Sequence, residues 1–230
     1  MSRKIVAVAA GVIENGDGRF LLGQRAANTF YPGYWEFPGG KVEANETPGA
    51  ALVRELDEEL GIAVEAYCPW LVRTHEYEHA SVRLHFFAVT RWRGEVRDHV
   101  HSALAWVAPG GDAPAPMLPA NGPILKALAL PRWMAVTHAA AIGVDAQLAA
   151  LDRALAAGLR LVQIREAALP EATRRAFAAE AVRRAHAVGA LALVNDTAEM
   201  ARAVGADGVH LTAAHLATCE ARPDFEWVGA

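Results

Sequence analysis

The chain has 230 residues, 53% of them hydrophobic, and a formal net charge of −4 at pH 7. This length suits one or two folded domains, and the composition excludes a disordered chain. The charge balance excludes the basic signature of a nucleic-acid-binding protein, and no apolar run is long enough to span a membrane. The two cysteines, Cys68 and Cys219, fit no metal-binding or redox spacing. We therefore expect reduced thiols and a cytoplasmic protein with neither nucleic-acid nor membrane partners.

The first part of the chain has the mixed rhythm of an α+β domain. Turn residues separate its apolar segments, and Val82, Leu84 and Phe86 alternate as in a strand with one buried face. The predicted elements, in chain order, are strands at 5–12, 20–25 and 35–37, a helix at 48–60, a hairpin of 72–77 and 82–92, a strand at 103–107 and a helix at 124–130. Pro131 then marks a boundary, so we expect a first domain at 1–130.

The rhythm changes after Pro131. Strands and helices now alternate regularly, which predicts parallel βαβ units. The predicted strands are 133–138, 159–165, 190–195 and 208–211, with another beginning at Glu226, and the predicted helices are 146–157, 171–188 and 198–204. At roughly 25–30 residues per unit, 131–230 would be about half of a (β/α)₈ barrel. We therefore expect a second, partial and truncated TIM-barrel-like domain.

Residues 40–62 carry acidic residues and glycines at fixed spacing. They fit the pattern G-x5-E-x7-R-E-U-x-E-E-x-G-U, where U is aliphatic, from Gly40 to Ile62. Thr47 and Gly61 are typical residues at the two ends of a helix. The helix places three carboxylates on one face, at a repulsive cost of about 0.2–0.5 kcal/mol per pair. These are Glu55, Glu58 and Glu59.

A bound cation explains the three like charges better than a solvated surface helix does. Mg²⁺ takes carboxylate oxygens together with water and phosphate oxygens, so it removes the repulsion. Arg54 is expected to point away from the carboxylates and to pair with Glu46 or Glu43. The pattern therefore predicts a site for a divalent metal ion and a diphosphate.

The pattern is the Nudix box, and the chain resembles the Nudix hydrolase family. From about residue 4 to 129 it is most similar to the MutT branch, which sanitises oxidised purine nucleoside triphosphates. Matching segments outside the box are Gly11–Ile13, Gln24–Ala27, Trp35–Lys41, Arg91–Glu95, Trp106 and Pro119–Ile124. The resemblance implies a Nudix fold, an α/β/α sandwich with a mixed sheet. It also implies hydrolysis of 8-oxo-dGTP to 8-oxo-dGMP and pyrophosphate, with Mg²⁺ or possibly Mn²⁺ as cofactor.

The resemblance also assigns roles to individual residues. The carbonyl of Gly39 and the carboxylates of Glu55, Glu58 and Glu59 would bind the metal ion, and the same glutamates would be catalytic. The substrate-binding set would be Arg25 at the phosphates or base, Phe37 packed on the base, Lys41, and Asn121 reading the purine edge. Three of these candidates could instead have a purely structural role: Asn121 as a turn residue, Phe37 as a core residue, and Arg25 in a surface ion pair.

One position departs from the MutT pattern and leaves the general base open. MutT-type enzymes have an acidic residue in the loop before the strand that contains Trp106, and a gapless match puts Val100 there. Asp98, His99 or His101 would have to stand in, or a glutamate of the box would act alone.

Three motifs of the second half are 161–166 (Leu-Val-Gln-Ile-Arg-Glu166), Asn195-Asp196 and 205–211 (Gly-Ala-Asp-Gly-Val-His-Leu). On these motifs the second half resembles thiamine-phosphate synthase. Gln163 and Arg165 would bind the pyrimidine diphosphate, and Asp196, after Asn195, a Mg²⁺ ion. The synthases have two cationic phosphate partners and a metal-binding Asp where this chain has Ala167, Thr197 and His215. Because such losses weaken diphosphate binding, we expect a degenerate or regulatory domain.

The leading hypothesis is therefore an oxidised-purine nucleoside triphosphate pyrophosphatase. Two alternatives remain open: a Nudix pyrophosphatase for another nucleoside diphosphate derivative, and a nucleotide-sensing module. The intact glutamates argue against a sensor. The sequence does not determine base selectivity or oligomeric state.

Overall fold

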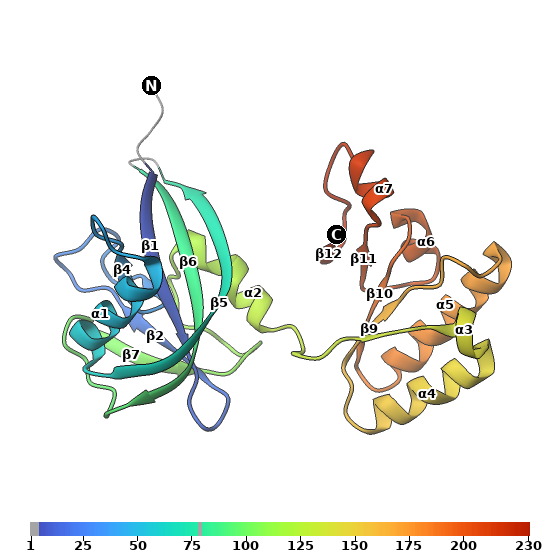
Figure 1. The fold of residues 1–230 in the computed structure, drawn as a ribbon, viewed down its shortest axis with the longest axis horizontal. Coiled ribbons are helices and arrows are strands. Elements are labelled where there is room, and N and C mark those ends of the chain that lie inside the picture. Colours follow the sequence, from blue (N-terminus) through green and yellow to red (C-terminus); the bar gives the residue numbers. More distant parts are fainter. Residues whose placement is uncertain (1–4, 78–79) are drawn as a thin grey trace. The chain divides into compact units, whose positions relative to one another are not determined.

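The structure, a computed structural model, describes residues 5–77 and 80–230. The chain forms two compact units, Met1–Leu130 and Pro131–Ala230. Figure 1 shows the elements of each unit. The turn of the predicted hairpin, 78–81, lies partly outside the described residues.

The first unit is built on two small sheets. The first has the strand order β4-β1-β6-β5 and the second the order β3-β2-β7. The strands of the first are β1 (Ile5–Ile13), β4 (Gly39–Lys41), β5 (Ala63–Glu76) and β6 (Ser81–Arg93). Those of the second are β2 (Phe20–Gln24), β3 (Trp35–Glu36) and β7 (Ala103–Val107). β1 runs parallel to β6 and antiparallel to β4, so the first sheet is mixed, as predicted.

Successive residues of β1 enter two different cores. Ala9 and Ile13 lie in the core beneath helix α1 (Pro48–Leu60), whereas Ala10 and Val12 lie in the core that contains Ile124 of α2 (Gly122–Leu128). Because adjacent side chains of a strand point to opposite faces, α1 and α2 cover opposite sides of the sheet (Figure 1). This arrangement is the predicted α/β/α sandwich.

Local sequence determines where α1 begins and ends. The Thr47 hydroxyl accepts a hydrogen bond from the amide of Ala50 at 3.2 Å, and Pro48 occupies the first turn. At the other end Gly61 adopts a left-handed conformation, φ 65°, and its amide donates to the carbonyl of Asp57. Leu52 and Leu56 are fully buried between these ends. Both predicted caps are therefore present.

Strand β5 is longer than the sequence indicates. The predicted strand 72–77 is only its second half, because Ala63–Glu76 pairs with β6 along its whole length. Pro69 and register shifts between Val64 and Leu71 hide the alternating pattern. A proline is tolerated there because β5 lies at the edge of the sheet.

The second unit has a parallel sheet with the order β12-β11-β10-β9-β8. The strands are β8 (Ala135–Val136), β9 (Leu161–Ile164), β10 (Leu191–Val194), β11 (Gly208–His210) and β12 (Trp227–Gly229). The helices are α3 (Ala139–Ile142), α4 (Val144–Ala156), α5 (Glu171–His186), α6 (Ala198–Ala203) and α7 (Ala213–Ala217). The predicted parallel βα rhythm is confirmed.

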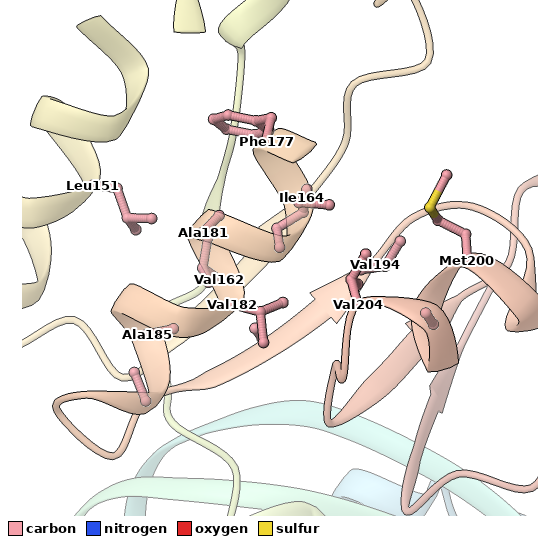
Figure 2. Close-up of a cluster of buried hydrophobic side chains, with 14 of the residues drawn as sticks. Leu151, Val162, Ile164, Phe177, Ala181, Val182, Ala185, Val194, Met200 and Val204 are labelled. Atoms are coloured by element: carbon pink, nitrogen blue, oxygen red, sulfur yellow. The ribbon is translucent and has the colours of Figure 1, made fainter. Parts of the chain in front are cut away.

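Helix α5 buries a narrow apolar stripe against this sheet. Phe177, Ala181 and Ala185 recur every four residues and lie in one hydrophobic core with Val162 and Val194 of the neighbouring strands (Figure 2). Small alanines at these positions let the helix lie close to the sheet. Among the described residues, no helix is both long and apolar enough to cross a membrane.

Candidate active site

Two glycines of β4 bring the helix carboxylates against the sheet. The amide of Gly39 donates a hydrogen bond to Oε2 of Glu59 at 2.9 Å. A Cβ atom at Gly40 would overlap the carboxylate of Glu55, and one at Gly39 would overlap the backbone of Ala9. Side chains at these positions are therefore excluded by the close approach of α1 and β1.

Glu59 is a nearly buried carboxylate whose charge is poorly compensated. Burial raises its pKa to about 8, and repulsion by Glu36 and Glu55 adds to the rise, while the hydrogen bond from Gly39 opposes it. A divalent cation beside Glu59 and Glu55 would offset this unfavourable charge. The chemistry of these two carboxylates therefore fits the metal ion that the box predicts.

Arg54 lies among the box glutamates, so the prediction that it points away from them is wrong. It bonds Glu46, as predicted, with two contacts of 3.0 Å. It also reaches Glu55 at 2.9 Å and Glu58 at 3.3 Å. Glu58 is one helical turn further along α1, within reach of a long guanidinium side chain.

The three box glutamates do not form one cluster. The side chain of Glu58 is 58% exposed, whereas that of Glu59 is 15% exposed. Across the described ranges, no three His, Cys, Asp or Glu side chains gather closely enough to hold a metal ion. Metal binding by Gly39, Glu55, Glu58 and Glu59 therefore stays a prediction.

Arg25 forms a bidentate ion pair with Glu36. The two distances are 2.6 and 2.7 Å, and Nε of Arg25 donates to the carbonyl of Phe30. Burial raises the pKa of Glu36 and Arg25 opposes that rise. This is the ion-pair alternative for Arg25, and its contact with substrate stays a prediction. The sequence analysis gave Glu36 no role, although it adjoins Phe37 in the matched segment.

The other substrate-binding candidates lie in different surroundings. Phe37 packs in the core against Phe20 and Phe86, with ring centroids 5.7 and 5.6 Å away, which is its plainer alternative. Asn121 is 4% exposed and precedes α2 without a capping bond from its side chain. Lys41 is exposed and its carbonyl accepts from Arg54.

The loop before β7 is fastened to the end of α1. The amides of Arg97 and His99 donate to the carbonyls of Leu60 and Glu59, each at 3.0 Å. Val100 is 49% exposed, whereas the His101 side chain is nearly buried beside Glu59. Of the residues weighed for the missing acid, His101 lies against the box carboxylates.

The candidate residues of the second unit are mostly engaged with their own fold. Asp196 pairs with Arg174 at 3.0 Å, and Asn195 donates to the carbonyl of His210 at 2.9 Å. Gln163 is buried, and the amide of Arg165 donates to the Thr137 hydroxyl.

Glu166, quoted in the synthase-like motif without a role, holds the start of α3. Its carboxylate accepts from the amides of Ala139 and Ala140 at 2.6 and 2.9 Å. Short polar loops of this kind give no sequence pattern that would reveal the contact.

Residues 9–127 match the NUDIX domain family, which covers half of the chain. The chain belongs to the Nudix family. Residues 133–230 match the family described as thiamine monophosphate synthase. The protein is thus a Nudix hydrolase with a second domain, and Nudix hydrolases generally use a divalent metal ion.

Two curated relatives match the Nudix domain over nearly their whole length. A CTP pyrophosphohydrolase of Escherichia coli K12 is 43% identical over 126 residues, which is 54% of this chain and 91% of the relative. An 8-oxo-dGTP diphosphatase of the same strain is 34% identical over 125 residues, 54% of this chain and 97% of the relative. A MutT Nudix hydrolase structure from Burkholderia pseudomallei is 30% identical, covers 54% of this chain and 97% of its own, and has a TM-score of 0.49.

Proposed function

We propose that this Nudix hydrolase cleaves 8-oxo-dGTP to 8-oxo-dGMP and pyrophosphate, with Mg²⁺ or Mn²⁺ as cofactor. Removal of the oxidised nucleotide before it enters DNA would prevent mutation. The observation that carries the proposal is the buried carboxylate of Glu59, held by the Gly39 amide at 2.9 Å beside Glu55. A carboxylate fixed in this way can orient a water molecule without first having to reorganise.

Different residues of the site would bind the metal ion, position the attacking water and contact the phosphates. Gly39 and the three box glutamates, Glu55, Glu58 and Glu59, would hold the cation, which when bound neutralises phosphate charge and activates water. Glu59 would position the attacking water in line with the phosphorus–oxygen bond that breaks. Arg25 is directed by Glu36 and the Phe30 carbonyl and would contact the phosphates.

Asn121 supports the preference for a purine base. Its side-chain amide both donates and accepts hydrogen bonds, which suits a purine edge. The residue is almost buried and its side chain is not used as a helix cap.

A second candidate substrate is CTP. The observation that favours it is the 43% identity to a CTP pyrophosphohydrolase, against 34% to an 8-oxo-dGTP diphosphatase from the same organism. The reaction and the metal site would be the same, and only the base would differ.

A substrate panel tests both candidates. Pyrophosphate release would be measured for 8-oxo-dGTP, dGTP, CTP and dCTP with Mg²⁺ or Mn²⁺. We expect the highest kcat/KM with 8-oxo-dGTP. A higher kcat/KM with CTP would instead identify CTP as the substrate.

Glu58→Gln and Glu59→Gln should each lower kcat by roughly a hundredfold or more. Asp57→Asn, an exposed change on the same helix, is the matched control, and near-normal turnover in both Glu variants would refute the metal-site assignment.

We propose that the second unit is a degenerate or regulatory domain rather than a thiamine-phosphate synthase. Ala167 and Thr197 supply no charge for a diphosphate, and Arg174 already neutralises Asp196. Incubation with the pyrimidine diphosphate and thiazole phosphate substrates of the synthases should give no thiamine phosphate. Formation of that product would overturn the assignment.

A further inference from the structure

The imidazole ring of His101 packs against the backbone of β2 at Gly23. A Cβ atom at Gly23 of β2 would overlap the His101 ring, so the ring lies directly against the strand backbone. The amide of His101 donates to Oδ1 of Asp98 at 2.7 Å, and the next amide, of Ser102, donates to the carbonyl of Gln24. These contacts hold the ring in place, with 3% of the side chain exposed.

Both ring nitrogens of His101 face carboxylates. Nε2 lies 3.9 Å from Oε2 of Glu59, and Nδ1 lies 3.8 Å from Oδ1 of Asp98. Nδ1 is buried and has no hydrogen-bond partner within the part of the chain that the structure describes. A buried polar atom without a partner costs about 1–3 kcal/mol.

We propose that Nε2 of His101 is a nitrogen ligand to a divalent cation shared with Glu59, and that Asp98 orients the ring through Nδ1. This inference rests on the proposed function, which makes Glu59 a metal ligand. Two ligand atoms that each lie roughly 2.1 Å from one ion are at most about 4.2 Å apart. The 3.9 Å between Nε2 and Oε2 is within that limit.

The position of Asp98 matches the usual support of a metal-binding histidine. Such a histidine commonly donates its other ring N–H to a carboxylate, which sets the tautomer and the ring orientation. Asp98 is already fixed by the amides of Val100 and His101. A small movement of the ring would bring Nδ1 from 3.8 Å into hydrogen-bond range.

A nitrogen ligand would change which metal ion the site prefers. Mg²⁺ favours oxygen ligands, whereas imidazole suits later transition metals, and Mn²⁺ accepts both types. We therefore expect this site to favour Mn²⁺ over Mg²⁺ more than an all-carboxylate version of the same site would.

His99 provides a matched control in the same loop. Its Nδ1 lies 3.3 Å from the carbonyl of Glu58, and its ring approaches Gly61 at the end of α1. His99→Ala removes an imidazole two residues from His101 and keeps the backbone bond of residue 99 to α1.

The test uses the full chain loaded with Mn²⁺ and no nucleotide, and its readout is electron-spin-echo modulation from a coordinated nitrogen. The modulation should be present in the wild type and in His99→Ala. It should be absent in His101→Gln and His101→Glu, both checked for folding by circular dichroism. His101→Glu should also lower the ratio of Mn²⁺ to Mg²⁺ affinity, and Asp98→Asn should weaken Mn²⁺ binding about tenfold.

Absence of nitrogen modulation in the wild type, or its persistence in both His101 variants, would overturn the proposal. Neither result depends on turnover. If the wild-type protein shows the nitrogen modulation but does not hydrolyse 8-oxo-dGTP, the proposed substrate is wrong and the assignment of His101 as a ligand is unaffected.

Discussion

Glu59, a proposed metal ligand, lowers the stability of the metal-free protein when it is ionised. Its pKa in the folded protein is raised from 4.5 to about 8, so the folded state binds the proton more tightly than the unfolded state does. The raised pKa of Glu59 therefore adds to the free energy of unfolding. This contribution is complete below about pH 4.5 and is lost as pH rises toward 8. An ionised, buried glutamate in the metal-free protein is therefore unfavourable.

Replacing this carboxylate should stabilise the metal-free protein at alkaline pH. We expect Glu59→Gln to remove the fall in the free energy of unfolding between about pH 5 and pH 8 that Glu59 causes. Urea unfolding with a chelator present, at both pH values, measures this difference. Asp57→Asn should keep the wild-type pH dependence. An unchanged pH dependence in Glu59→Gln would contradict the assigned pKa.

Asn121 should decide which base the site prefers. A site that hydrogen-bonds a purine edge loses discrimination when that partner is removed. We expect Asn121→Ala to lower kcat/KM for 8-oxo-dGTP by roughly tenfold or more and to change kcat on dGTP little. Parallel steady-state kinetics on the two substrates give the comparison. An equal loss on both would make Asn121 structural.

At the level of elements, the box helix depends on a cap that the sequence already indicates. The Thr47 hydroxyl accepts from the Ala50 amide, and losing such a cap costs about 1 kcal/mol. We expect Thr47→Ala to lower the Tm, whereas Thr74→Ala, an exposed change on β5, should not. Thermal unfolding followed by circular dichroism checks this, and equal Tm values for the two variants would show that the cap contributes nothing.

At the scale of the whole molecule, the Nudix unit should be independent of the second unit. Among the described residues, the two hydrophobic cores of the unit 1–130 are built from that unit's own side chains. We expect a 1–130 fragment to fold and to hydrolyse 8-oxo-dGTP with a kcat close to that of the full chain. Limited proteolysis and pyrophosphate release on both proteins test this. An unfolded or inactive fragment would contradict the two-domain division.

The sequence alone determined the features that depend on local spacing. The caps of α1 and the βα rhythm after Pro131 follow from local sequence and from helix and strand periodicity, and the structure has them. The length of β5 could not be predicted from the sequence, because Pro69 and the register shifts interrupt its alternating pattern. Pairing with β6 nevertheless extends the strand across this interruption.

Only the tertiary structure decided the contacts between distant segments. Arg54 lies among the box glutamates, Arg25 pairs with Glu36, and His101 lies between Asp98 and Glu59. Periodicity says which face of an element a residue is on, but not which part of another element approaches that face. Backbone hydrogen bonds join the loop before β7 to the end of α1, and the His101 ring of that loop fits against β2 because Gly23 has no side chain. The residue types at single positions do not reveal either contact.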